Sequence, residues 1–154
     1  MDRVLAVIER FVIFFITLTI ILFTLYIVSP IVNDNVAKKT AVELVEIPLP
    51  NNTELMESIY KAGKLVGNGN GMQYFGAILI KSELSLDELI EYYAEFADNE
   101  WTCVVENQIN TDVDAKIMDI TLSFKTNIDG NNYYIVYSWG DNTTIFHEFD
   151  LRGH

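Results

Sequence analysis

An uncharged apolar stretch runs from Phe11 to Val32 and constrains this chain more than any other feature of its sequence. Its most polar side chains are three threonines and Ser29. At about 1.5 Å of rise per residue, a helix of this length spans roughly 33 Å, which matches a hydrocarbon core of about 30 Å. A soluble protein rarely buries so long a helix that is apolar on every face. The sequence therefore predicts a transmembrane helix at 11–32, with the lipid bilayer as its partner.

The residues that flank this stretch indicate its orientation in the membrane and whether it is cleaved as a signal peptide. Residues 1–10 form a short tail of mixed charge, and a cleaved signal peptide is the competing interpretation. The apolar core of a signal peptide is normally shorter, and no small-x-small cleavage site precedes the polar residues 33–35. Arg10 abuts the apolar run, whereas Lys38 lies several residues beyond it. This slight asymmetry favours a single-pass protein of the cell membrane, with a cytoplasmic N-terminus and the C-terminal domain outside.

The chain is acidic, with 22 Asp and Glu against 10 Lys and Arg and a net charge of −12. Because phosphate binding needs a basic face, this composition argues against nucleic acid as a partner. The acidity is typical of a soluble, self-repelling surface domain, and it also suits a cationic partner or a divalent metal. Cys103 is the only cysteine, so no internal disulfide can form. Its alternation with Trp101 and Val105 predicts a buried, unreactive thiol.

The segment after the apolar run is expected to connect the membrane to a soluble domain. Residues 33–46 are predicted to form a tether, polar as far as Thr40 and extended from Val42 to Ile47. Two prolines, Pro48 and Pro50, would end the extended part. The pattern at 51–64 fits either a short helix or an irregular segment.

The first strong signals of the soluble part lie between residues 72 and 99. Met72–Ser82 is rich in aromatic and β-branched residues and predicts a strand. Ser85-Leu-Asp-Glu88 is a capping box, in which the Ser85 hydroxyl and the Glu88 carboxylate satisfy each other's free backbone amides. Apolar residues then recur at helical spacing as far as Ala97. The sequence predicts an amphipathic helix that ends near Asp98-Asn99 and packs on the sheet.

The remaining chain has the alternation and turn signals of strands. Strands are predicted at 100–107, 116–126, 132–139 and 144–151, with a hairpin turn at 129–131. Residues 47–154 are therefore predicted to form one α+β domain, an antiparallel β-meander with a single helix packed on it.

Several short motifs of this domain resemble a loose group of small bacterial proteins. These motifs are Lys81-Ser82, the Leu84–Leu89 run, Tyr92-Tyr93, Trp101, the sequence GNGNGMQYF at 67–75 and the closing DLRGH at 150–154. Proteins of that group carry a lipid or transmembrane anchor and a compact extracytoplasmic α+β domain. The resemblance implies this architecture and transfers no catalytic residue.

One candidate binding site is the loop made of Gly67, Asn68, Gly69, Asn70 and Gly71. Glycines let backbone amides approach an anion, a partner or a ligand. The loop lacks the Gly-Lys-Ser/Thr ending of a phosphate-binding loop, and no dinucleotide spacing follows it. A turn that exploits the tolerance of Gly and Asn for positive φ is the alternative.

A second group of candidates lies near the end of the sequence. Arg152 is expected to pair with Asp150 or with an acidic partner surface, or to lie in a loose terminal tail. His147 is predicted to share a strand face with Ile145 and Phe149 as a half-buried, hydrogen-bonded residue. No Ser, Cys or Asp motif of a catalytic triad accompanies it.

Asp112 and Asp114 have the spacing that begins a calcium loop. Ala115 stands where such a loop needs glycine, and Thr121 where it needs glutamate. A weak calcium site is one interpretation and a solvated loop is the other. No metal or cofactor is predicted.

These observations predict a membrane-anchored protein whose acidic extracytoplasmic domain binds another protein or an envelope component. They predict no enzyme activity, because no catalytic constellation is recognisable. The alternative is a membrane-tethered envelope enzyme, hydrolase-like, with its site near Gly67–Gly71.

Overall fold

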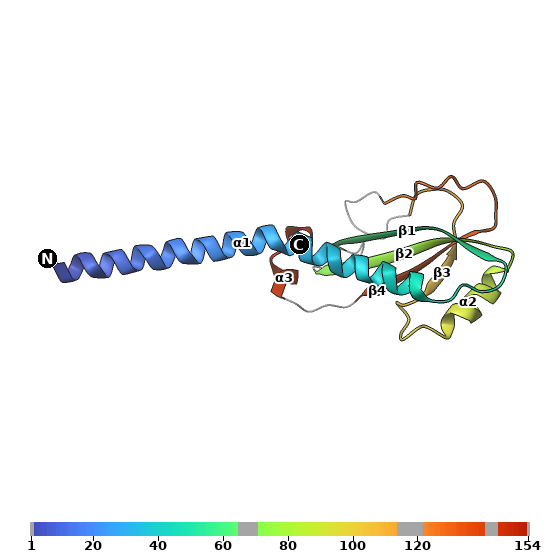
Figure 1. The fold of residues 1–154 in the computed structure, drawn as a ribbon, viewed down its shortest axis with the longest axis horizontal. Coiled ribbons are helices and arrows are strands. Elements are labelled where there is room, and N and C mark those ends of the chain that lie inside the picture. The colour runs from blue at the N-terminus through green and yellow to red at the C-terminus, as the bar shows by residue number, and fades with distance from the viewer. Residues whose placement is uncertain (1, 65–70, 114–121, 141–144, 154) are drawn as a thin grey trace.

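One long helix, α1 (Asp2–Glu46), carries a small α+β domain on its C-terminal part (Figure 1). The fold is that of a computed structural model, which describes residues 2–64, 71–113, 122–140 and 145–153. The N-terminal part of α1 projects away from the domain, and none of its most apolar part is buried. The predicted helix at 11–32 is confirmed, and it is long and apolar enough to cross a membrane.

The segment predicted as an extended connection is helical, because α1 continues without interruption to Glu46. Its buried side chains, Asn33, Ala37, Ala41 and Leu44, follow one another at three- or four-residue spacing and so lie on one face of the helix. This face packs on the sheet. The prediction of an extended chain from Val42 to Ile47 is wrong, because the small buried residues give α1 a surface that fits closely on the strands.

The sheet has four antiparallel strands: β1 (Thr53–Lys64), β2 (Met72–Ser82), β3 (Val104–Asn107) and β4 (Tyr133–Gly140). Their order is β1-β2-β4-β3, so β4 inserts between β2 and β3. The α+β class is confirmed, but the sheet is not a simple meander. The segment 51–64, for which a helix or an irregular chain was expected, is mostly the edge strand β1.

Helices α1 and α2 (Leu86–Ala94) lie on the same face of the sheet. The apolar cluster between them joins Leu44 of α1 and Leu89 of α2 to Ile78 and Val136 of the two central strands. The approach of α1 is closest at Gly76, where an added Cβ would lie 2.4 Å from the Ala41 nitrogen. Gly76 is therefore required by the proximity of the helix backbone.

The predicted capping box of α2 is confirmed. The Ser85 side chain accepts a hydrogen bond from the Glu88 amide, and the Glu88 carboxylate accepts one from the Ser85 amide at 2.8 Å. These bonds hold the pKa of the Glu88 carboxyl below its usual value. Leu89 and Tyr93 form the buried stripe of the helix.

Loop residues cover the opposite face of the sheet. Val113 and Phe124 pack on the aromatic cluster of β2 and β4, and the Glu57 carboxylate accepts the amides of Lys125 and Thr126. Most of the strand predicted at 116–126 lies outside the described residues. Its described part, 122–126, forms only an isolated bridge between Ser123 and Asp112, so it is not the hairpin partner of β4.

The C-terminal segment is helical, whereas a strand was predicted for 144–151. It forms a short helix, α3 (Ile145–Glu148), and a 3-10 turn, η1 (Leu151–Gly153). Both lie beside α1 at the point where α1 joins the domain (Figure 1). Contacts with α1 thus override the alternating pattern of this segment. His147 is half-buried as expected, but on a helix.

Candidate functional site

Buried polar side chains join α1 to the sheet and to the C-terminal segment. The Asn33 amide donates to the Asp150 carboxylate at 2.9 Å and to the Phe146 carbonyl at 3.1 Å. The Tyr74 hydroxyl donates to the Asn33 side-chain oxygen at 3.1 Å. Asn33 and Asp150 are almost fully buried. Each polar group of the Asn33 side chain is therefore satisfied inside the protein, as a buried amide requires.

Arg152 completes this polar junction and is not part of a loose tail. Its guanidinium donates to Asp150 at 2.7 Å, to Asp34 at 2.9 Å and to the Pro30 carbonyl at 3.1 Å. Burial raises the pKa of Asp150, but hydrogen bonds from Arg152 and Asn33 outweigh burial and lower it overall. The bond to Asp150 likewise raises the pKa of Arg152, against the effect of burial. Both groups are therefore held in their charged forms.

The two predicted binding elements approach each other at this junction. Gly71, next to Arg152's turn, donates its amide to the Gly153 carbonyl at 2.7 Å. Its φ of 147° falls in the region that favours glycine. The His147 ring lies beside it, and its Nε2 accepts a hydrogen bond from the Met72 amide at 3.4 Å. Gly67, Asn68, Gly69 and Asn70 lie outside the described residues.

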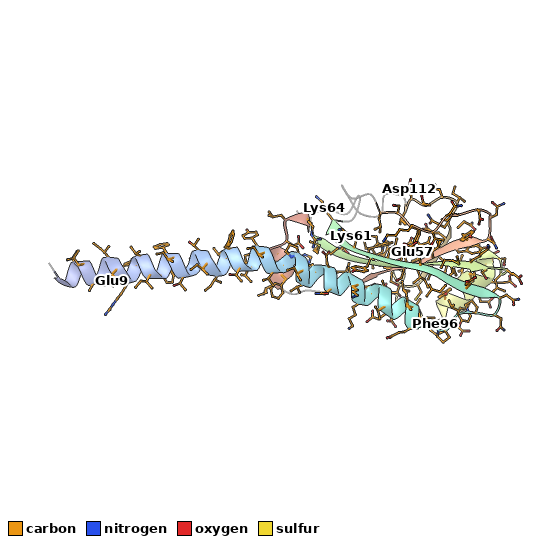
Figure 2. The ribbon with its side chains drawn as sticks, turned by 45° about the horizontal axis from the view of Figure 1, so that its top comes forward. Glu9, Glu57, Lys61, Lys64, Phe96 and Asp112 are labelled. Atoms are coloured by element: carbon orange, nitrogen blue, oxygen red, sulfur yellow. The ribbon has the colours of Figure 1, made fainter. Side chains whose placement is uncertain are left out.

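A groove with a volume of about 370 Å³ opens between the C-terminal part of α1, the loop after α2 and the end of β4. One wall is formed by Glu43 and Leu44 of α1 and by Ile47, which follows the end of the helix. The facing wall includes Phe96 and Asp98, and Figure 2 shows Phe96 beside the C-terminal end of α1. A volume of this size is within the range of sites that hold a small molecule or a few side chains.

The groove combines an apolar lining with acidic groups at its rim. Leu44, Ile47 and Phe96 supply apolar surface, while the carboxylates of Glu43 and Asp98 are exposed. Glu43 makes an exposed ion pair with Lys39 at 3.5 Å. Such a surface suits a ligand that is both apolar and cationic.

The floor of the groove contains Cys103. The Cys103 amide donates to the Ser138 hydroxyl at 2.8 Å, and its backbone has a φ of 55°. Burial raises the pKa of the Cys103 thiol, which keeps it protonated and unreactive. The predicted burial of this residue is confirmed.

The residues described near the predicted calcium loop do not assemble a metal site. Asp112 uses its backbone in the bridge to Ser123, and its amide donates a hydrogen bond to the Asn110 side-chain oxygen at 2.8 Å. Asp114 lies outside the described residues. Across the described part of the chain, no group of three His, Cys, Asp or Glu side chains has the geometry to hold a metal ion.

Sequence reasoning found Arg152 and Gly71 but missed Asn33, Asp34 and Tyr74. The signal for Asn33 is its four-residue spacing to Ala37 and Ala41, which continues the helical period beyond the apolar run. Nothing local marks Tyr74 as its partner, because that contact spans 41 positions of the chain. The groove also has no local signal, since its walls come from three separate segments.

Comparison with known proteins adds no relative to these observations: no protein-family model, curated protein or solved structure matches the chain.

Proposed function

We propose that this protein is a single-pass membrane protein that presents its acidic domain outside the cell and binds another protein through the groove. The observation that carries the proposal is the continuity of α1. The same helix contains the apolar stretch and supplies a wall of the groove, through Glu43 and Leu44. A partner bound in the groove would be held at a defined height above the bilayer, because no flexible linker separates the apolar stretch from the groove.

The chemistry of the groove suggests its occupant. An apolar side chain would replace water against Leu44 and Phe96, and a neighbouring Lys or Arg would reach Glu43 or Asp98. The net charge of −12 would also steer a cationic partner toward the domain. We therefore propose a protein segment that carries a basic residue next to an aliphatic or aromatic one.

Cross-linking in intact cells followed by pull-down in mild detergent tests this proposal. The first comparison is between the full chain and a chain whose residues 11–28 are replaced by an unrelated membrane helix. A partner that recurs with both would bind the domain. The second comparison is between the charge-reversed groove variant E43K/D98K and the matched control E83K/E91K, which makes the same change in net charge at exposed positions. Loss of the partner in the groove variant alone is expected.

Two results would count against the proposal. If no partner recurs with either membrane helix, the domain does not act as a binding module, and a search for small-molecule ligands follows. If E43K/D98K and E83K/E91K lose the partner equally, net charge and not the groove governs binding. The orientation has its own test, because protease added to intact cells should degrade an external domain.

A further inference from the structure

The C-terminal segment 145–152 packs along the last turns of the apolar stretch of α1. The ring of Phe149 meets the ring of Tyr26 edge to face, with centroids 5.6 Å apart. Arg152 reaches the Pro30 carbonyl, and the Phe146 carbonyl accepts the Asn33 amide. These contacts place the segment beside residues 26–33, while the predicted span extends to Val32.

Apolar side chains at this level are exposed on both elements. Ile145 is 63% exposed and Leu151 is 72% exposed on the C-terminal segment. Ile27 and Ile31 are 54% and 61% exposed on the adjoining turns of α1. Both elements therefore carry exposed apolar side chains near the level at which Phe149 contacts Tyr26. Figure 1 shows α3 directly beside α1 at the base of the domain.

Glu148 is exposed, but the other two charged groups at the end of this segment, Asp150 and Arg152, are held in a form that can lie close to hydrocarbon. Arg152 is paired with Asp150 and Asp34, and it also donates to the Pro30 carbonyl. Asp150 is nearly fully buried and accepts the Asn33 amide as well. A charge that is paired and hydrogen-bonded costs far less to bring near a bilayer than an isolated one.

We propose that residues 145–151 form a membrane-contacting collar around α1, with Ile145, Phe149 and Leu151 inserted into the lipid interface. The collar rests on the proposed membrane anchor. If 11–32 spans the hydrocarbon, Tyr26 lies roughly 9 Å below the end of the span at about 1.5 Å per residue, and Phe149 lies at the same depth. This depth is below the headgroup level that Tyr and Trp favour, so the apolar Phe149 ring would contact the outer part of the lipid chains. The collar fixes the domain against the membrane surface and limits the tilt of α1.

Depth-dependent fluorescence quenching tests the collar on the full chain. In a C103S background, the variant L151C supplies a single cysteine, which is labelled with an environment-sensitive dye. The labelled protein is then reconstituted in phosphatidylcholine vesicles that contain nitroxide lipids. F23C reports on the anchor, and I90C in α2, at the far end of the domain, is the exposed control (Figure 1). We expect the L151C label to lose fluorescence and shift to the blue as F23C does, while I90C stays unquenched.

The same labels separate failure of the collar from failure of the anchor. Quenching at F23C with L151C as bright as I90C would overturn the collar and leave the membrane anchor intact. Absence of quenching at F23C would overturn both. A label at 151 that is unquenched in vesicles but shielded in cell membranes would assign the surface to a protein partner and refute contact with lipid.

Discussion

The Asn33 amide donates to the Asp150 carboxylate at 2.9 Å, across 117 positions of the chain. This bond joins the helix that carries the apolar stretch to the C-terminal segment, and Tyr74 of β2 joins the same side chain from the sheet. Three elements therefore meet at one buried amide. The position of the domain relative to the apolar stretch depends on this junction.

Replacing Asn33 by Ala should lower the free energy of unfolding by about 3 kcal/mol, because Tyr74 and Asp150 would each lose a buried partner. The measurement is urea unfolding of the full chain in detergent, followed by near-ultraviolet circular dichroism. The exposed Asn51 is the control, and N51A should change the free energy of unfolding by less than about 0.5 kcal/mol. Equal effects of the two substitutions would contradict the structural role of Asn33.

The ionisation of Asp150 should make stability depend on pH in the acid range. Its pKa is lowered in the folded protein, so the ionised carboxylate contributes stability above the unfolded pKa of about 3.9. That contribution is lost as the pH falls through the folded pKa. As the pH is lowered from 6 to 2.5, the free energy of unfolding should therefore decrease more steeply for the wild type than for D150N. If the free energy of unfolding changes with pH equally in the wild type and in D150N, Asp150 does not cause this pH dependence.

Substitution of Gly76 by Ala should separate α1 from the sheet. The added Cβ would meet the Ala41 nitrogen at 2.4 Å, and neither backbone can move without loss of packing. We expect a loss of about 3 kcal/mol in the free energy of unfolding. In G130A the added Cβ meets only a side-chain oxygen at 3.2 Å, and thermal unfolding should show a much smaller change.

Two tyrosines of the same core should respond in opposite directions to loss of the hydroxyl. The Tyr93 hydroxyl is buried and has no hydrogen-bond partner among the residues that the structure describes, so Y93F should raise stability by about 1 kcal/mol. The Tyr134 hydroxyl donates to the Leu84 carbonyl at 2.9 Å, so Y134F should lower stability by about 1 kcal/mol. If Y93F destabilises the protein, its hydroxyl has a partner in solution, such as a buried water.

Cys103 should be protected from thiol reagents in the folded protein. Its side chain is buried and its thiol pKa is raised by that burial, so little thiolate is available. Reaction with a disulfide reagent at pH 8 should be at least about tenfold slower than in urea. A ligand in the groove should slow it further, since Cys103 forms part of the floor.

The sequence predicts the elements that are specified locally and misses those specified by contact. The Ser85 and Glu88 capping box places α2 correctly, because both partners lie within one turn. The C-terminal part of α1 looks like a polar tether because Asn33, Ala37 and Thr40 are small or polar, yet these are the residues that let a helix approach the strands closely. Residue size, as well as hydrophobicity, therefore determines where this helix ends.

The sheet order and the C-terminal segment show the same limit. Alternation identifies β4, but its insertion between β2 and β3 depends on pairings distant in sequence. Residues 144–151 alternate like a strand, but the described residues from Ile145 form α3 and η1, and Phe149 and Asp150 contact α1 there. Of the candidate sites, Arg152 pairs with Asp150 as predicted, but its bonds to Asp34 and to the Pro30 carbonyl span 118 and 122 positions, and no local pattern reveals them.

The burial of Asn33, Ala37, Ala41 and Leu44 also determines which fragments of this protein can exist on their own. A soluble fragment that starts at Ile47 would leave the sheet without its covering helix and expose Ile78 and Tyr74. A fragment that starts at Ser29 would retain every buried residue of α1. Proteolytic cleavage within residues 33–46 would therefore separate the sheet from part of its covering helix and release a destabilised domain.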